Sequence, residues 1–174
     1  LEKMIAPFAD PAIAGASGEK KTHQTNLWAQ YVQIEYDYKY ALMRNHVYTD
    51  FIDSSTAAYR RDVFVQNGGF DTAFMEAEDT ELSFRLAEGG CKMVLIRDAI
   101  VYHQHPTSTW EYLRRKVQYS RWRAVVYRKF PRKVASETRT PWAQKFQVPL
   151  AFAMLFFIVG AGVWNLLAWG ALFL

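Results

Sequence analysis

The residues best suited to chemistry form an acidic cluster, Glu78-Asp79-Thr80-Glu81, which follows a glycine pair at Gly68 and Gly69. Glycine tolerates positive φ, so the pair predicts a sharp turn before the cluster. Asp79 would then lie at the N-terminus of a helix, where the helix dipole favours an ionised carboxylate. Carboxylates gathered at such a position indicate a chemical role rather than a packing role.

The helix that carries this cluster must be held in place by an apolar side. That side is predicted to consist of Leu82, Phe84 and Leu86. Glu81 and Arg85 have the i,i+4 spacing of an ion pair on the helix surface, and Gly89 with Gly90 would end the helix.

The segments around the cluster alternate between helix and strand. Residues 21–48 are predicted to form a helix, and its core side is expected to carry Leu27, Tyr31, Ile34, Tyr38, Ala41 and Leu42. Strands are predicted at 51–59, 92–96 and 99–102, with the polar stretch Asp53-Ser54-Ser55-Thr56 bordering a pocket. The alternation predicts an α/β fold with a mixed or parallel sheet.

Composition and charge narrow the possible classes of protein. The chain has 174 residues, of which 51% are hydrophobic, and this content excludes a disordered chain. Residues 1–96 carry 9 basic and 14 acidic side chains, whereas residues 97–174 carry 12 and 3. The second half is therefore strongly basic and suited to phosphate groups or an anionic membrane. The single cysteine, Cys91, excludes an internal disulfide.

The C-terminal segment has the composition of a membrane span. Residues 148–174 contain no charged side chain, and a helix needs about 20 residues to cross the bilayer core. The preceding basic residues, Arg132, Lys133, Arg139 and Lys145, predict that the N-terminal side of the span lies in the cytoplasm. The alternative is a buried helix of a soluble core. The chain begins without methionine and ends within the apolar run, so we expect a fragment.

A basic amphipathic helix is predicted between the acidic cluster and the span, at 108–130. Its apolar stripe includes Trp110, Leu113 and Val117, and seven Lys and Arg residues border that stripe. This composition predicts an interfacial helix that contacts anionic membrane lipids, and the alternative is a helix packed on the domain with a solvated basic face. Nucleic acid is not an expected partner, because no nucleic-acid-binding motif accompanies the charge.

Several motifs in a fixed order resemble the family 2 glycosyltransferases. They are the segment from Phe8-Ala9-Asp10-Pro11 to Gly18, then Tyr59-Arg60-Arg61, Gly68-Gly69-Phe70-Asp71, Glu78-Asp79-Thr80-Glu81-Leu82 and Val101-Tyr102-His103-Gln104-His105-Pro106. The resemblance covers residues 1–130. It implies the C-terminal half of a Rossmann-like A-type glycosyltransferase fold at 1–106, followed by the interfacial helix and linker at 107–147 and a transmembrane helix at 148–174.

The resemblance also implies roles for individual residues. Asp79 is expected to be the general base that takes a proton from the acceptor hydroxyl, with Glu78 and Glu81 tuning its pKa. His103 is the candidate metal ligand. Further acceptor or substrate contacts are expected from Gly69, Phe70, Asp71, Glu81, Gln118, Arg121 and Trp122.

The expected reaction is inverting transfer of a sugar from a nucleotide-sugar donor to a lipid-linked or growing glycan acceptor, at the cytoplasmic face of the cytoplasmic membrane. Family members hold the donor and Mg²⁺ or Mn²⁺ with an Asp-x-Asp motif, and this chain contains no such motif. The sequence therefore predicts that the nucleotide-binding half and the main metal ligands lie outside this fragment, which by itself should have negligible activity.

Two other functions stay open at this point. Gln118-Tyr119-Ser120-Arg121-Trp122 matches the Gln-x-x-Arg-Trp signature of processive synthases similar to cellulose and hyaluronan synthases, whereas His103-Gln104-His105-Pro106 is more similar to nonprocessive transferases. A noncatalytic, membrane-tethered module that binds glycan or protein would keep the fold without the reaction.

Overall fold

The computed structural model describes residues 1–172, without the side chains at 142–144, 148–149 and 163–172. The chain divides into two compact units, residues 1–139 and 140–174. The first unit contains the α/β part of the chain, and the second contains one long helix. Residues 173–174 of the predicted membrane span lie outside the described residues.

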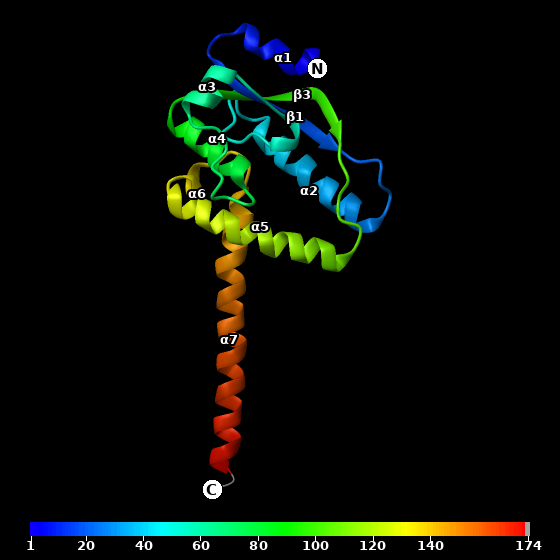
Figure 1. The fold of residues 1–174 in the computed structure, drawn as a ribbon. Coiled ribbons are helices and arrows are strands. Elements are labelled where there is room, and N and C mark those ends of the chain that lie inside the picture. The colour runs from blue at the N-terminus through cyan, green and yellow to red at the C-terminus, as the bar shows by residue number, and fades with distance from the viewer. Residues whose placement is uncertain (173–174) are drawn as a thin grey trace. The chain divides into compact units, whose positions relative to one another are not determined.

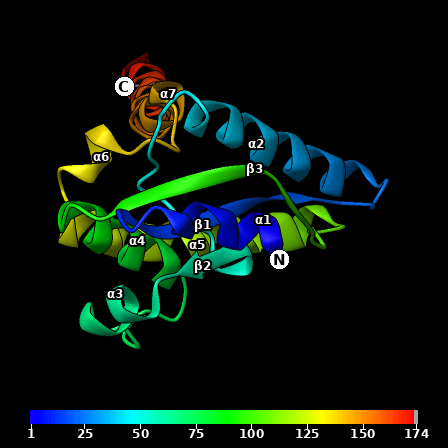
Figure 2. The ribbon, with the colours of Figure 1, turned by 90° about the horizontal axis from the view of Figure 1, so that it is seen from above.

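Within the described residues, the first unit is built on a sheet of three strands in the order β2-β1-β3. The central strand β1, Ile13–Lys21, is buried over almost its whole length. It pairs antiparallel with β2, Ala57–Tyr59, and parallel with β3, Lys92–Tyr102. Figures 1 and 2 show β1 and β3 side by side, with helices on the flanks of the sheet. The α/β class with a mixed sheet is confirmed.

Two predicted strand boundaries were wrong. The strands expected at 92–96 and 99–102 form the single strand β3, and its register against β1 shifts between Ser17 and Glu19. A β-bulge accommodates extra residues without ending a strand, so the charged pair Arg97-Asp98 does not interrupt β3. Of the strand expected at 51–59 only β2 forms, because Asp53 begins the short 3₁₀ helix η2, Ser54–Thr56.

Helix α2, Leu27–Met43, is shorter than predicted and packs with a different face. Asn26 caps its N-terminus by accepting a hydrogen bond from the backbone N–H of Ala29 at 2.9 Å. The side expected in the core is exposed: Leu27 is 79% exposed and Ile34 66%. The buried side instead carries Ala29, Val32, Gln33, Tyr40 and Met43.

Helix α4, Glu78–Glu88, carries the acidic cluster as predicted. Leu82, Phe84 and Leu86 are fully buried, the first and last of them against Ile52 and Met93. The preceding turn uses positive φ at Gly68 and Gly69, and Ala77 also adopts φ 60° immediately before the helix. Two short helices, α1 at Glu2–Ile5 and η1 at Ala6–Ala9, precede β1, and α3, Arg61–Gln66, follows β2.

Helix α5, Thr109–Lys129, follows β3 and confirms the helix predicted at 108–130. Its side chains Tyr119, Trp122, Val126 and Tyr127 pack around Phe84, whereas Trp110, Leu113 and Val117 are exposed. The short helix α6, Lys133–Ser136, follows it and leads to Arg139.

The second unit consists mainly of α7, Trp142–Leu172. Among the described residues, it contains one stretch, Lys145–Gly162, that is long and apolar enough to cross a membrane, by length and composition alone. All described side chains from 150 to 162 are exposed.

Candidate active site

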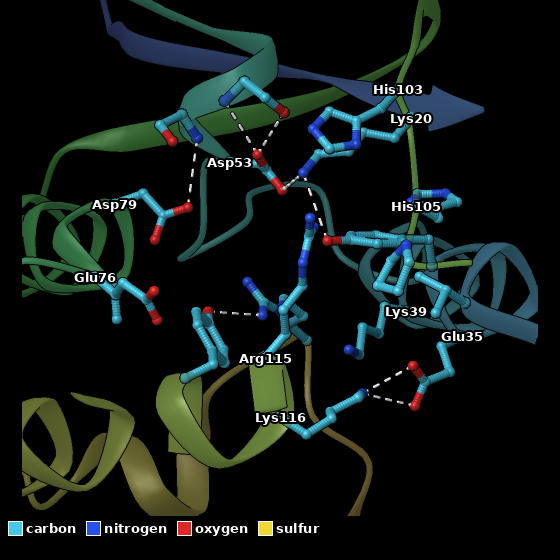
Figure 3. Close-up of a pocket in the computed structure, with 18 of the residues that line it drawn as sticks. Lys20, Glu35, Lys39, Asp53, Glu76, Asp79, His103, His105, Arg115 and Lys116 are labelled. Atoms are coloured by element: carbon cyan, nitrogen blue, oxygen red, sulfur yellow. Dashed lines mark hydrogen bonds and ion pairs between the residues drawn. The ribbon is translucent and has the colours of Figure 1, made fainter. Parts of the chain in front are cut away.

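A cavity of about 520 Å³ lies beside the N-terminus of α4, and its walls come from segments far apart in the sequence (Figure 3). Strand β1 and helix α2 contribute one side, the segments 51–55 and 75–79 another, and α5 closes a third. The charged lining residues are Lys20, Glu35, Lys39, Asp53, Glu76, Glu78, Asp79, Arg115, Lys116 and Arg139, with His103 and His105 beside them.

Asp79 projects into this cavity from the first turn of α4. Burial raises the pKa of its carboxyl group above the usual value, and this effect exceeds the opposing influence of the Arg139 charge. Its contacts are long: the backbone N–H of Ser54 donates to Oδ2 at 3.4 Å, and the Thr80 hydroxyl donates to Oδ1 at 3.2 Å. Asp79 is thus a carboxylate in a partly desolvated position whose basicity is increased, as a proton acceptor requires.

Asp53, another carboxylate of the cavity lining, has the opposite electrostatic environment. Its Oδ2 lies 2.7 Å from Nζ of Lys20, and its Oδ1 accepts hydrogen bonds from the backbone N–H and hydroxyl of Ser55. Although burial alone would raise the pKa of Asp53, Lys20 and Ser55 hold it below the usual value. Asp53 therefore stays ionised and paired, which leaves Asp79 as the better proton acceptor.

Arg139 reaches the cavity from the segment after α6 and was not predicted as a site residue. Its side chain is almost completely buried, its guanidinium lies 3.7 Å from the centre of the Phe51 ring, and it donates a hydrogen bond to the Tyr119 hydroxyl at 3.0 Å. Lys20 and Lys39 were missed as well, because a single lysine in a strand or helix gives no local signal of function. On α5, however, the positions Tyr112, Arg115, Lys116 and Tyr119 follow helical spacing, and this spacing could have identified the cavity face.

His103 lines the cavity just after β3. Burial lowers the pKa of its imidazole, and its Nδ1 is buried without a hydrogen-bond partner among the described residues. A neutral imidazole with a free ring nitrogen fits one ligand of a metal ion. The described residues contain no group of three or more His, Cys, Asp or Glu side chains arranged to hold a metal, so His103 would need ligands from elsewhere.

The predicted contacts from the glycine turn and Glu81 lie outside the cavity lining. Glu81 is fully buried, not on the surface as predicted, and forms ion pairs with Arg85 at 2.6 Å and Lys129 at 2.7 Å. The Gly69 carbonyl accepts a hydrogen bond from Arg85, and Asp71 lies 3.3 Å from Lys129. Phe70 packs edge-on against the rings of Tyr59 and Phe64. The contacts with Arg85 and Lys129 hold the glycine turn against α4 and α5.

The predicted contacts on α5 also face away from the cavity lining. Gln118 and Arg121 are exposed, and Trp122 packs against the Phe74 ring at 5.9 Å. The structure therefore brings Glu78, Asp79 and His103 to one cavity and leaves Gln118, Arg121 and Trp122 outside it.

Comparisons with known proteins relate the chain to one enzyme family. The family model described as glycosyltransferase like family 2 matches residues 1–123. The O-antigen chain rhamnosyltransferase RfbN of Salmonella typhimurium is 28% identical over 114 residues, covering 60% of this chain and 36% of the relative. The pre-mycofactocin glycosyltransferase of Mycobacterium tuberculosis is 25% identical over 141 residues, covering 78% of this chain and 30% of the relative. The chain thus spans about a third of the length of these curated relatives.

Proposed function

We propose that this chain, which belongs to the family 2 glycosyltransferases, carries the acceptor and catalytic-base half of an inverting sugar transferase. The observation that carries the proposal is the contrast between two carboxylates in one cavity. The negative charge of Asp53 is balanced by an ion pair with Lys20. Burial raises the pKa of Asp79, and no lysine or arginine forms an ion pair with Asp79 among the described residues. Paired carboxyl groups with pKa values pushed apart are typical of acid and base assignments in active sites.

The proposed step is a direct displacement. A hydroxyl oxygen of the acceptor attacks the anomeric carbon of a nucleotide sugar, while Asp79 accepts the hydroxyl proton. The bond from the anomeric carbon to the phosphate oxygen breaks, a nucleoside diphosphate leaves, and the configuration at that carbon is inverted. Mg²⁺ or Mn²⁺ would supply neutralisation of the diphosphate charge, and the free ring nitrogen of His103 is suited to be one of its ligands.

We further propose that the reaction takes place at the cytoplasmic face of a membrane. Two features support this location: the apolar stretch Lys145–Gly162 of α7, and the exposed apolar residues Trp110, Leu113 and Val117 on the basic helix α5. The relatives named as O-antigen chain rhamnosyltransferases support a lipid-linked or growing glycan as the acceptor.

The test is turnover by membranes that contain the full-length gene product, supplied with UDP-, GDP- and dTDP-sugars, Mg²⁺ or Mn²⁺, and acceptor lipids. Loss of a general base lowers the rate by about 10²–10⁴-fold, so Asp79→Asn should decrease kcat by that factor while donor KM changes little. Asp62→Asn is the matched control, because Asp62 is exposed on α3 and lies outside the cavity lining. Release of nucleoside diphosphate that is unchanged in Asp79→Asn would remove Asp79 from the base role.

A further inference from the structure

Besides its carboxylates, the cavity carries a concentration of positive charge. We call this set of residues, Lys39 of α2, Arg115 and Lys116 of α5 and Arg139 after α6, the basic wall. Figure 3 shows Glu76 and Asp79 on one side of the pocket and Lys39 with Lys116 on the other. The cavity thus has one side suited to accept a proton and another suited to bind an anion.

Two cations of the basic wall, Lys39 and Arg139, form no ion pair among the described residues, although Arg139 donates a hydrogen bond to Tyr119. The structure records no ion pair or hydrogen bond for Nζ of Lys39 among the described residues, and its ammonium lies 5.6 Å from the centre of the Tyr36 ring. Arg139 is only 8% exposed, and its Nε is buried without a hydrogen-bond partner within the same residues. Lys116, in contrast, is paired with Glu35 at 2.8 Å.

A protein rarely buries a cation without a counter-charge, because desolvation of the ion is costly. Burial, together with the positive charges of Arg139 and Lys116, lowers the pKa of Lys39 to about 7, although the Glu35 carboxylate acts in the opposite direction. An anion bound against Lys39 and Arg139 would remove this cost. The guanidinium group of Arg139 offers parallel N–H donors, a geometry that matches the oxygens of a phosphate.

We propose that the basic wall binds a phosphate group of the acceptor, which is a sugar attached to a lipid through a diphosphate. This inference rests on the proposed function and names the substrate class of the same site. The acceptor, rather than the donor, is indicated by α5. The helix places Arg115 and Lys116 in the cavity and exposes Trp110, Leu113 and Val117 by 75%, 48% and 53%.

A helix with basic and exposed apolar residues side by side fits a molecule that has both a phosphate and a hydrocarbon chain. The lipid chain would lie along the apolar residues of α5, and the phosphate would enter the cavity next to Lys39 and Arg139. The attached sugar then extends towards Asp79, because the phosphate site and the proton acceptor share one cavity of about 520 Å³. Cavities of about 300–1,000 Å³ are typical for single small ligands.

The test measures binding of farnesyl diphosphate and of farnesol to the full-length protein in detergent. Wild type should bind farnesyl diphosphate at least about 10-fold more tightly than farnesol, since charged hydrogen bonds contribute this much to affinity. Arg139→Gln and Lys39→Gln should each abolish most of that preference. The matched control is Arg97→Gln, because Arg97 is exposed on β3 away from the cavity lining. Arg139→Gln removes the contacts of Arg139 with Phe51 and Tyr119. If this variant does not fold for that reason, Lys39→Gln still decides the test.

Binding of UDP, GDP and dTDP to the same variants distinguishes the two sources of phosphate. The proposal predicts that affinity for these nucleotides is unchanged in Lys39→Gln. A loss of nucleotide affinity in that variant, alone or together with a loss of farnesyl diphosphate affinity, would assign the basic wall to the donor and overturn the proposal. Equal affinity of wild type for farnesyl diphosphate and farnesol would overturn it as well. Because these are binding measurements, they remain informative if Asp79→Asn shows that the proposed reaction is wrong.

Discussion

Replacement of Asp53 by Asn should destabilise the first unit far more than replacement of Asp37 by Asn, although both carboxylates pair with neighbouring lysines at 2.7 Å. In the pair of Lys20 with Asp53 the side chains are 7% and 12% exposed, whereas in the pair of Lys21 with Asp37 they are 34% and 45% exposed. Loss of one partner of a buried pair costs about 3–5 kcal/mol because it leaves the other charge unpaired. Exposed pairs contribute only about 0–1 kcal/mol.

The measurement is thermal unfolding followed by intrinsic fluorescence of the detergent-solubilised protein. A domain of this size loses about 2–4 °C in Tm per kcal/mol. Asp53→Asn should therefore lower Tm by about 6–20 °C, and Asp37→Asn by no more than about 4 °C. Equal shifts in the two variants would show that burial of the Lys20 pair does not determine its contribution to stability.

The pH dependence provides a second check on the same pair. The folded-state pKa of Asp53 lies below its usual value of 3.8, so its contribution to stability is fully present above that value and is lost as the pH falls through the folded pKa. The Tm difference between wild type and Asp53→Asn should thus be constant near pH 7 and decrease only below about pH 4. A difference that decreases between pH 8 and pH 6 would contradict this explanation.

Two further predictions concern the sheet and the basic wall. Gly18→Ala should lower the free energy of unfolding by about 1–3 kcal/mol, because a Cβ there would lie 2.2 Å from the Ala99 carbonyl oxygen and would separate β1 from β3. Gly90→Ala should lower it by only about 1–2 kcal/mol, because its Cβ would meet open space and only the φ of +79° opposes it. A larger loss of Tm in Gly90→Ala than in Gly18→Ala would refute the steric explanation. Lys39→Met should raise Tm at pH 6 but not at pH 10. The pKa of Lys39 is lowered from 10.5 to about 7 in the folded state. The free-energy cost of burying its charge is therefore fully present below the folded pKa and disappears as the pH rises towards 10.5. A stabilisation that is equal at both pH values would mean that charge is not its cause.

The elements around the acidic cluster could be predicted because their local signals agree. In α4 the glycine turn, the apolar spacing and the terminal glycines all indicate the same helix, and the structure confirms it. The packing of α2 could not be predicted in this way, because both of its sides carry large apolar residues. Its buried side is selected by partners on β1: the Tyr40 hydroxyl accepts a hydrogen bond from the backbone N–H of Lys20 at 2.8 Å, and Gln33 donates one to the Lys20 carbonyl.

The directions in which the carboxylates of the acidic cluster project could not be predicted from the local sequence either. Asp79 and Glu81 are two positions apart, and successive residues of an α-helix are rotated by about 100°, so the two carboxylates project in widely different directions. Glu81 consequently meets Arg85 and Lys129, whereas Asp79 faces the cavity. The sequence presents both as members of one acidic cluster, and helical rotation separates them into a structural and a candidate catalytic role.

The distinction between Asp53 and Asp79 requires tertiary structure. Each is an aspartate beside serine or threonine residues at the beginning of a helix, so the local sequence gives them similar environments. What separates them is Lys20, which lies 33 positions before Asp53 and is brought to it by the central strand of the sheet. The lysine neutralises one carboxylate and leaves the other with a raised pKa. Lys20 therefore acts on the proposed base indirectly: it holds Asp53 in its ionised state, and the negative charge of Asp53 helps to raise the pKa of Asp79.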